Sequence, residues 1–516
     1  MQFRRFYVGS VSVALGYTMQ ATVAAWLMAT LTPSALMVAL VQTASTLPTL
    51  LLGLHAGALA DMLDRRRIVL TTLWLLIGVT GLIGAAQIAG VLGPVALLAG
   101  TFLIGIGFTF YLPAQQSNIN ELVDRVDLPR AVGLGALSFN LSRAIGPALA
   151  GAVAAWLGTG SAFLASTLFF GVMIYVVQGW KRRAAPLPGV RDTMMSAIRS
   201  GLRFARHSPP MRALLIRSFS FSICAAAFWA LLPVIARDQL GLGAGGFGVL
   251  SASFGIGAIG AALTVPRHLH RLSLNRVVTW GYFLWAGALL VMVVADSVFM
   301  AILSTAVAGI AWVMVLPSLS GGVQSTAPAW VRARAVAMSL VVMQASLAVG
   351  SVIWGWVAST WSLDMALSVS ASLMLLMLAL TWRVRVRMGE EGDVTPGMAL
   401  PEMAIDTEPL PDDGPVLIQV EYCIEPRERA AFLEAIHRIE PIRRRNGASD
   451  WRVFRDLGEE GRFVERFVLG SWAEYVRLRS RLTMADQQTQ EKVEAFLRPG
   501  EQIHVTRLIS TKPYDE

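Results

Sequence analysis

The sequence has few charged residues and almost no cysteine. Charged side chains make up 15% of the 516 residues, whereas soluble globular chains carry about 25%. The two cysteines, Cys224 and Cys423, lie far apart in the chain. This excludes a disulfide framework and a cysteine-based metal cluster, so we predict no metal site and no cofactor. No Asp or Glu falls in the middle of a long apolar run.

Apolar residues are abundant, at 55% of the chain, and they gather in twelve runs. Each run is close to the ~20 residues that a helix needs to cross a bilayer. The runs lie near 6–29, 36–60, 68–90, 94–116, 131–157, 161–180, 212–236, 246–266, 277–295, 298–320, 335–359 and 363–382. Their links alternate between arginine-rich and nearly arginine-free, and arginine-rich links stay in the cytoplasm. The pattern predicts a multi-pass protein of the lipid bilayer with both termini cytoplasmic.

The apolar part repeats itself at an offset of 204 residues, without a gap from residue 105 to residue 151. The matching segments are Gly105–Phe108 with Gly309–Trp312, Arg130–Val132 with Arg334–Val336, Gly146 with Gly350, and Gly151 with Gly355. A duplicated six-helix unit is indicated. Chains built this way hold a small ligand between their halves, near the membrane midplane.

Composition divides the chain into five segments. Residues 1–382 hold 23 basic and 9 acidic residues, whereas residues 383–516 hold 20 and 25. We predict a six-helix bundle at 1–180, a cytoplasmic loop at 181–211, a second bundle at 212–387, a flexible linker at 388–414 and an α+β domain at 415–516. Apolar residues among the arginines of 191–207 favour an amphipathic helix on the inner leaflet. A solvated linker is the alternative there.

The C-terminal domain carries the pattern of a small soluble fold. Strands are predicted at 416–424, 450–456, 462–469 and 503–508, and helices at 426–445 and 473–497. The order βαββαβ is that of the ferredoxin-like fold. No nucleophile–base pair, Cys/His cluster or phosphate loop occurs in it, so no catalytic residue is predicted. Dimerisation or regulation is favoured over catalysis.

The link at residues 57–67 carries a glycine, an acid and three arginines between two apolar runs. It resembles the loop G-x-L-a-D-r-x-G-r-k of the major facilitator superfamily, which acts there as a latch between conformations. The resemblance implies a gating role for Gly57, Asp61, Arg65, Arg66 and Arg67. Met62 and Asp64 replace a basic residue and a glycine of that pattern.

More narrowly, the membrane part is similar to the exporter branch that contains the enterobactin exporter and the transmembrane secretion effectors. The likeness rests on Leu112–Gln116, Ser138–Gly151 and Trp330–Ala335. The C-terminal domain is similar to the dimeric α/β-barrel domain of antibiotic-biosynthesis monooxygenases, through Val420–Tyr422, Arg443–Ala448, Phe454–Asp456 and Ser471–Glu474. The resemblance implies export of a siderophore, drug or secondary metabolite, often in exchange for protons. It also implies a homodimer through the C-terminal domain.

Arg143 is a charge inside an apolar helix. Such a charge rarely faces lipid. Either it binds a polar or anionic group of the substrate, or it holds helices together through backbone carbonyls and Asn140.

Neutral polar and aromatic residues in the spans are further candidates for substrate contact, because aromatic cavities with few polar groups accept varied ligands. The candidates are Asn140, Gln20, Gln115, Gln344, Trp26, Phe228 and Trp229. Core or lipid-facing packing is the alternative for each. Gly146, Pro147 and Gly151 fit the fifth-helix antiporter motif of the superfamily, where proline removes a hydrogen bond and lets the helix bend; tight packing is the alternative. Asp61 and His55 are the residues to consider for proton coupling.

These observations predict an all-α membrane protein of two six-helix repeats with a ferredoxin-like cytoplasmic domain. Its predicted function is secondary transport across a bacterial inner membrane by alternating access, without nucleic acid as a partner. Two rivals stay open: a membrane-tethered enzyme with a catalytic C-terminal domain, and a lipid transporter of the same fold.

Overall fold

The computed structural model describes residues 2–122, 128–179, 194–269, 272–397 and 408–510. The chain forms two compact units. The membrane unit comprises Met1–Gly189, Ile216–Leu319 and Ser339–Arg385. The second unit comprises Val190–Leu215, Ser320–Met338 and Val386–Glu516.

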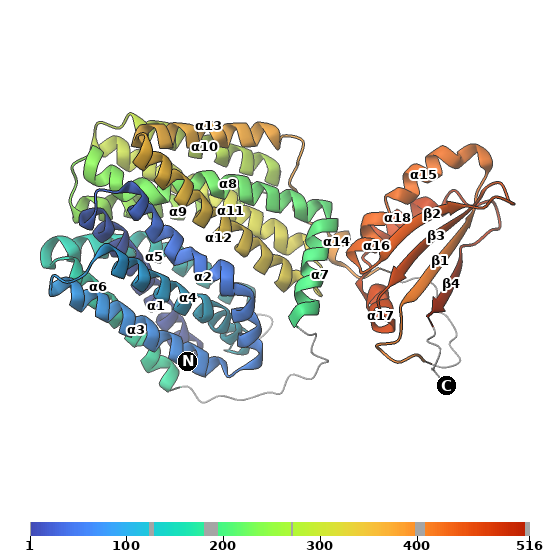
Figure 1. The fold of residues 1–516 in the computed structure, drawn as a ribbon, viewed down its shortest axis with the longest axis horizontal. Coiled ribbons are helices and arrows are strands. Elements are labelled where there is room, and N and C mark those ends of the chain that lie inside the picture. The colour runs from blue at the N-terminus through green and yellow to red at the C-terminus, as the bar shows by residue number, and fades with distance from the viewer. Residues whose placement is uncertain (1, 123–127, 180–193, 270–271, 398–407, 511–516) are drawn as a thin grey trace. The chain divides into compact units, whose positions relative to one another are not determined.

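Long helices joined by short links make up the apolar part of the chain, in two groups (Figure 1). The first group is α1 (Gln2–Leu31), α2 (Ala35–Met62), α3 (Arg65–Ile88), α4 (Pro94–Leu122), α5 (Leu128–Leu157) and α6 (Thr159–Gln178). The second is α8 (Pro209–Val234), which continues as the π-helical turn η1 (Ile235–Gln239), then α9 (Ala244–Leu269), α10 (Leu274–Val293), α11 (Val298–Thr326), α12 (Arg332–Thr360) and α13 (Leu363–Leu380).

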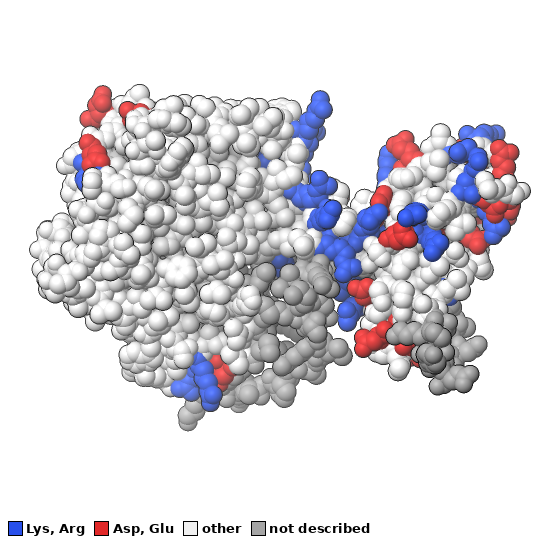
Figure 2. All heavy atoms as spheres, viewed as in Figure 1, with Lys and Arg blue, Asp and Glu red and all other residues white. Residues whose placement is uncertain are grey.

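Eleven helices of the described chain are long and apolar enough to cross a membrane, and α5 adds a shorter apolar stretch at Leu141–Leu157. Figure 2 shows a broad face of the helical part without charged side chains, with charges at its ends. The predicted fold class, a polytopic helical membrane protein with a small α+β domain, is confirmed.

Polar side chains fix where several helices begin. The Ser34 hydroxyl accepts a hydrogen bond from the backbone N–H of Met37, and the Asp64 carboxylate accepts one from Arg66. Both occupy the N-cap position, where a side-chain oxygen satisfies an otherwise unpaired N–H. Asp64 therefore starts α3 where the superfamily pattern has glycine.

The second unit contains the connecting helix α7 (Met194–His207) and the C-terminal domain. The elements of that domain, with the short α14 (Glu391–Val394) before it, are β1 (Val416–Cys423), η2 (Pro426–Glu428), α15 (Arg429–His437), α16 (Glu440–Arg445), β2 (Ser449–Arg455), β3 (Arg462–Leu469), α17 (Trp472–Arg481), α18 (Met484–Glu494) and β4 (His504–Ile509). The strands form one sheet in the order β2-β3-β1-β4, with antiparallel neighbours. This is the arrangement that βαββαβ predicts.

Both helices predicted for this domain are interrupted. The one expected at 426–445 ends at His437 and restarts at Glu440. Pro441, which has no N–H to donate, is tolerated only in the first turn of the new helix. The one expected at 473–497 breaks at Leu482, because Thr483 and Asp486 form a capping box that starts α18.

A buried ion pair lies in the core of the C-terminal domain. The Arg443 Nε donates to Glu465 Oε1 at 2.9 Å, and the side chains are 3% and 0% exposed. Trp451 Nε1 and the Tyr422 hydroxyl also donate to the Glu465 carboxylate, at 2.8 and 3.0 Å. Burial alone would lower the pKa of Arg443, but the adjacent Glu465 outweighs burial and raises that pKa.

Candidate binding site between the two halves

The guanidinium of Arg143 on α5 lies among three aromatic rings of the second half. Its central carbon is 5.1 Å from the ring centre of Trp312 on α11, 5.5 Å from Trp229 on α8 and 5.8 Å from Phe254 on α9. A cation within about 6 Å of an aromatic face is attracted to it, most strongly where water is excluded. Arg143 therefore joins the first half to three helices of the second.

These rings belong to a larger aromatic cluster. The Trp229 and Phe254 rings lie 4.5 Å apart, and Trp285 lies 5.8 Å from Trp312 and 5.4 Å from Phe228. Phe228 and Trp229, which the sequence proposed for substrate contact, thus lie at the Arg143 site. Sequence reasoning missed Phe254 and Trp312, since nothing local distinguishes them from lipid-facing aromatics.

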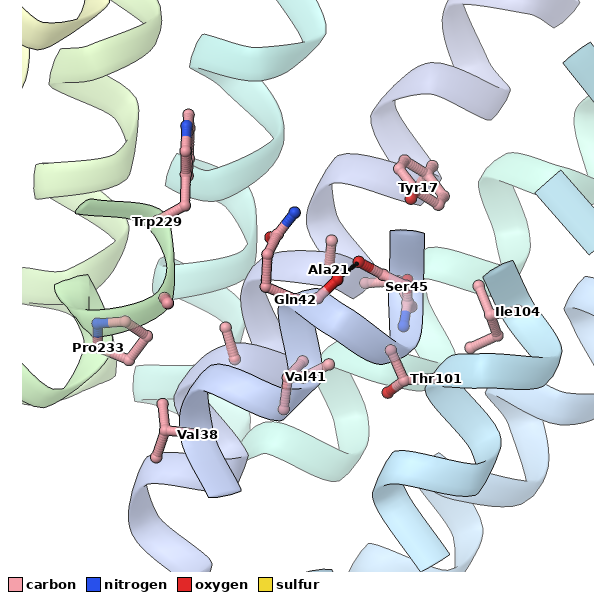
Figure 3. Close-up of a pocket in the computed structure, with 14 residues that line it drawn as sticks. Tyr17, Ala21, Val38, Val41, Gln42, Ser45, Thr101, Ile104, Trp229 and Pro233 are labelled. Carbon is pink, nitrogen blue, oxygen red and sulfur yellow. Dashed lines mark hydrogen bonds between the residues drawn. The ribbon is translucent and has the colours of Figure 1, made fainter. Parts of the chain in front are cut away.

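A cavity of about 40 Å³ lies between the halves beside Trp229. Figure 3 shows Trp229 and Pro233 on one side of it and Tyr17 and Ile104 on the other, with Gln42 between them. A cavity needs about 10–15 Å³ to hold one water, so this one has room for only a few water molecules. Binding pockets for small molecules have about 300–1,000 Å³, so a ligand would require the halves to separate here.

Buried hydrogen-bond donors around the site lack acceptors. Within the described chain, Gln20 Nε2, Trp229 Nε1 and Trp285 Nε1 are buried without a hydrogen-bond partner. An unsatisfied buried donor costs about 1–3 kcal/mol. Gln20 and Trp229 line the cavity, and Arg143, which does not line it, lies against the Trp229 ring, so the region offers donors and a positive charge. It suits a ligand that supplies acceptor oxygens, such as a carboxylate, together with an apolar body.

Other residues proposed for substrate contact lie elsewhere. Gln115 donates from Nε2 to the Ser10 hydroxyl at 2.9 Å, and Trp26 stacks on Phe247 of α9 with ring centres 5.6 Å apart. Gln344 is half-buried on α12 and does not line the cavity. The side chain of Asn140 lies outside the described residues.

Glycines bring α5 close to its neighbours, with a seam of small residues between α5 and α9. A Cβ at Gly151 would lie 2.8 Å from the Gly248 Cα, and one at Gly248 would lie 2.8 Å from the Pro147 carbonyl oxygen. A Cβ at Gly146 would overlap the Thr18 hydroxyl on α1. Of the predicted hinge residues, Gly146 and Gly151 thus permit close helix packing.

The repeat reproduces these contacts on the other side of the molecule. Gly350, the counterpart of Gly146, leaves no room for a Cβ against the Ile223 carbonyl of α8. Gly355, the counterpart of Gly151, leaves none against Ala39 of α2. Gly151 of the first half and Gly248 and Gly355 of the second half therefore pack closely against the opposite half.

The predicted gating loop is short, because α2 ends at Met62 and α3 begins at Arg65. Arg66 Nη2 donates to the Gln178 carbonyl at the end of α6, at 2.9 Å. Gly57 of this loop is loosely packed, because among the described residues a Cβ there would meet nothing within 4 Å. The Asp61 side chain lies outside the described residues, and His55 is exposed on α2, away from Arg143.

Comparison with known proteins gives a consistent family assignment. Residues 1–514 match the family described as transmembrane secretion effector. The chain is 25% identical over 283 residues to the staphyloferrin A transporter of Staphylococcus aureus, covering 54% of this chain and 70% of that protein. It is 28% identical over 370 residues to the multidrug efflux pump Tap of Mycolicibacterium fortuitum, covering 67% and 87%.

Solved structures with the same fold are also transporters. A bacterial homologue of the human lysosomal transporter Spinster, in an inward-facing and occupied conformation, has a TM-score of 0.61 at 13% identity. The match covers 74% of this chain and 96% of that one. The nucleoside transporter NupG has a TM-score of 0.59 at 13% identity, covering 74% and 98%. At this identity the likeness shows the fold alone.

Proposed function

The chain belongs to the transmembrane secretion effector family of the major facilitator superfamily, and on that premise we propose that it exports a small amphipathic molecule with acceptor oxygens. The observation that carries the proposal is Arg143 among three aromatic rings of the opposite half. Arg143 and its ring partners Trp229, Phe254 and Trp312 would hold the acidic group, and the rest of the aromatic cluster the apolar body. The names of the two relatives, a staphyloferrin A transporter and a multidrug efflux pump, support a siderophore, drug or secondary metabolite as the substrate class.

The family and its relatives are transporters, so the chain is a transporter and not a membrane-tethered enzyme. A lipid substrate has no specific support, because the site described above offers donors and charge rather than a continuous apolar wall.

We propose that this conformation is the inward-facing one. The halves meet at the end that carries the α1–α2 link: Gly151 crosses Gly248, Ala39 lies against Gly355, and Arg237 Nη1 donates to the Thr32 carbonyl at 2.8 Å. Arginines at the opposite helix ends support placing both termini in the cytoplasm of a bacterial inner membrane.

Alternating access would then require the α5–α9 and α2–α12 seams to open. In this proposal Gly146, Pro147 and Gly151 form the hinge of α5. The loop of Gly57, Asp61, Arg65, Arg66 and Arg67 is the latch at the cytoplasmic end.

The decisive experiment is efflux from a bacterial strain that lacks its own exporters. Candidate siderophores and drugs are screened with the wild type, and the transported one is then tested with Arg143→Gln and Arg143→Lys. We expect Gln to abolish export and Lys to restore part of it, because Lys keeps the charge but not the planar guanidinium. Arg452→Gln, which replaces an exposed arginine of β2 outside the membrane unit, controls for expression. Unchanged export in Arg143→Gln contradicts the proposal.

Proton exchange is the driving reaction we propose, with Asp61 and His55 as the groups to replace first. Proteoliposomes with a pH gradient and no membrane potential should export substrate, and Asp61→Asn or His55→Gln should reduce the pH dependence. Absence of export under the pH gradient, or export without any opposite movement of protons, would contradict this part.

Homodimer formation through the C-terminal domain is a further part of the proposal. One face of the sheet is buried under helices, and the other carries the cross-strand row Leu508, Leu417 and Val468. Leu508 is 49% exposed. Light scattering on the full chain should give a dimer mass that Leu417→Glu converts to the monomer mass; a monomeric wild type would contradict pairing.

A further inference from the structure

The second unit contains a cavity of about 310 Å³, distinct from the Arg143 site. Its walls come from the end of α7, the start of α8, the last residue of α11, α14 with the preceding Arg387, Arg438 just after α15, and helices α16 and α18. The volume is in the range of small-molecule sites. Nothing in the proposed transport cycle uses this cavity.

Positive charge dominates its lining. Four cations, Arg387, Arg438, Arg445 and Lys492, face two carboxylates, Asp393 and Asp486. Arg387 pairs with Asp393 at 2.9 Å, and Arg445 pairs with Asp486. These two pairs use both carboxylates.

The other two cations of the lining, Arg438 and Lys492, are not held in buried ion pairs of the described chain. Arg438 pairs with Glu434, but both side chains are more than 65% exposed, and such pairs contribute little. Lys492 has no ion-pair partner among the described residues. The lining therefore carries two positive charges more than its own carboxylates neutralise.

Two polar groups of the lining are also unsatisfied. Arg445 Nε and Thr326 Oγ1 are buried and have no hydrogen-bond partner in the described part of the chain. Thr326 is the last residue of α11, and the Arg445 guanidinium lies 5.9 Å from the ring centre of Phe204 on α7. A bound group with acceptor oxygens would satisfy both.

The cavity lies where the C-terminal domain is held against α7 and its neighbours. Arg481 lies 4.3 Å over the ring of Trp330, which contacts Phe204 edge-on at 6.0 Å. Arg203 of α7 pairs with Glu474 of α17 at 3.5 Å. Phe204 therefore packs on protein, although the sequence predicts that α7 lies on the lipid surface.

We propose that this cavity binds a dianion bearing carboxylate or phosphate groups. Guanidinium groups recognise both of these planar or tetrahedral oxygen clusters with paired hydrogen bonds. The dianion matches the two surplus charges. Bound there, it bridges α7 to α15 and α18 and fixes the C-terminal domain on the helix that connects the two halves.

The test uses the full chain in phosphatidylcholine nanodiscs, with succinate and inorganic phosphate as probes. We expect saturable binding by calorimetry, and slower hydrogen exchange in α7 when the probe is bound. Arg438→Gln with Lys492→Gln should weaken binding about tenfold or more. Arg452→Gln, an exposed β2 arginine paired with Asp450, is the matched control and should bind like the wild type.

Absence of saturable binding, or equal affinity in the double variant, overturns the proposal. The two replaced side chains are exposed, so we expect the double variant to fold. Unchanged hydrogen exchange in β1 and β3 will verify this. Thr326→Val provides a second, uncharged variant, and weaker binding there supports the same site. Phosphatidic acid in the nanodisc, a lipid whose phosphomonoester has two ionisable oxygens, distinguishes the source of the dianion: competition with succinate assigns the cavity to a lipid phosphate, and no competition assigns it to a soluble dianion.

Discussion

The side chain of Arg143 departs from the rule that membrane helices exclude charge. A charge at mid-membrane costs at least about 2.5–3.5 kcal/mol unless it is compensated. Three rings from the other half compensate it here. Because those rings and Arg143 belong to different halves, the compensation depends on how the halves are arranged.

The indole N–H of Trp229 is predicted to bind substrate directly. Trp229→Phe keeps an aromatic ring but removes a donor that has no acceptor in the described chain. We expect the KM for the exported compound to rise roughly five- to tenfold, the cost of one hydrogen bond, with little change in thermal stability. Trp472→Phe removes a buried, unpartnered N–H in the C-terminal domain, at the start of α17, and should leave KM unchanged. Equal effects of the two variants would contradict the assignment.

Glu465 is predicted to be essential for the fold of the C-terminal domain. Glu465→Gln leaves the Arg443 charge buried without a counter-charge, and breaking one partner of a buried pair costs about 3–5 kcal/mol. Hydrogen exchange over β1 and β3 in the full chain should accelerate by several powers of ten. Glu434→Gln breaks only the exposed pair with Arg438 and should change exchange little. Similar protection in both variants would show that the buried pair is dispensable.

Tyr422 makes the stability of this domain sensitive to alkali. Burial and then the Glu465 charge raise the pKa of Tyr422 well above its ordinary value of 10.0. In the unfolded chain this phenol ionises near pH 10, whereas in the folded domain it stays protonated to higher pH. The folded domain therefore has its full stability below pH 10 and loses stability as the pH rises above it. We expect the midpoint of thermal unfolding of the C-terminal domain, measured in the full chain from pH 8 to pH 11, to decrease with pH less steeply in Tyr422→Phe than in the wild type. If the midpoints of the wild type and of Tyr422→Phe decrease equally with pH, Tyr422 is not the source of the alkali sensitivity.

Arg143 could be found from the sequence because a charge in an apolar run is a local signal. Its ring partners Phe254 and Trp312 could not, because the chain has many aromatics and only the packing of the halves selects these two. The same limit explains why Gln115 and Trp26 were proposed for the site, although they contact Ser10 and Phe247 instead.

At the scale of elements, the α5–α9 seam is a close contact between the halves. Gly248→Ala would place a Cβ 2.8 Å from both the Gly151 Cα and the Pro147 carbonyl, and overpacking of this kind costs about 1–3 kcal/mol. We expect a lower thermal midpoint and slower export. Gly245→Ala on the same helix meets only the Ala155 Cβ at 3.6 Å and should be nearly neutral. A Gly248→Ala protein with wild-type melting and export would show that the seam is looser than described.

Most helices and strands could be predicted, because apolar length and alternation are strong signals. The interruptions at Pro441 and Leu482 were missed, since the surrounding residues favour a continuing helix and the capping contacts that end it are local details. The 204-residue repeat predicted the paired glycines Gly146 and Gly350, but not which neighbouring helix each one meets.

At the scale of the whole molecule, Arg237 secures the closed end of the membrane unit. Its guanidinium donates to the carbonyls of Ala29 and Thr32 across the two halves. Charged hydrogen bonds of this kind contribute about 1.5–3 kcal/mol, so Arg237→Gln should shift the population about tenfold or more towards the opposite state. Spin labels at Val91→Cys and Asp296→Cys, exposed positions in the α3–α4 and α10–α11 links, should report a longer distance between the halves in the variant.

For that measurement Cys423 is replaced by Ser, while the buried Cys224 is retained. Arg237→Lys keeps one donor group and should give an intermediate distribution. An unchanged distance distribution in Arg237→Gln would mean that the glycine seams alone keep this end closed.

The connecting helix α7 has a consequence for protein engineering. Phe204 and Arg203 of α7 contact the C-terminal domain. That domain therefore depends on a helix from the middle of the sequence and is not an independent module. A chimera that appends residues 408–516 to another carrier would leave these α7 contacts behind. Transplanting the domain successfully requires exchanging the mid-chain connector together with it.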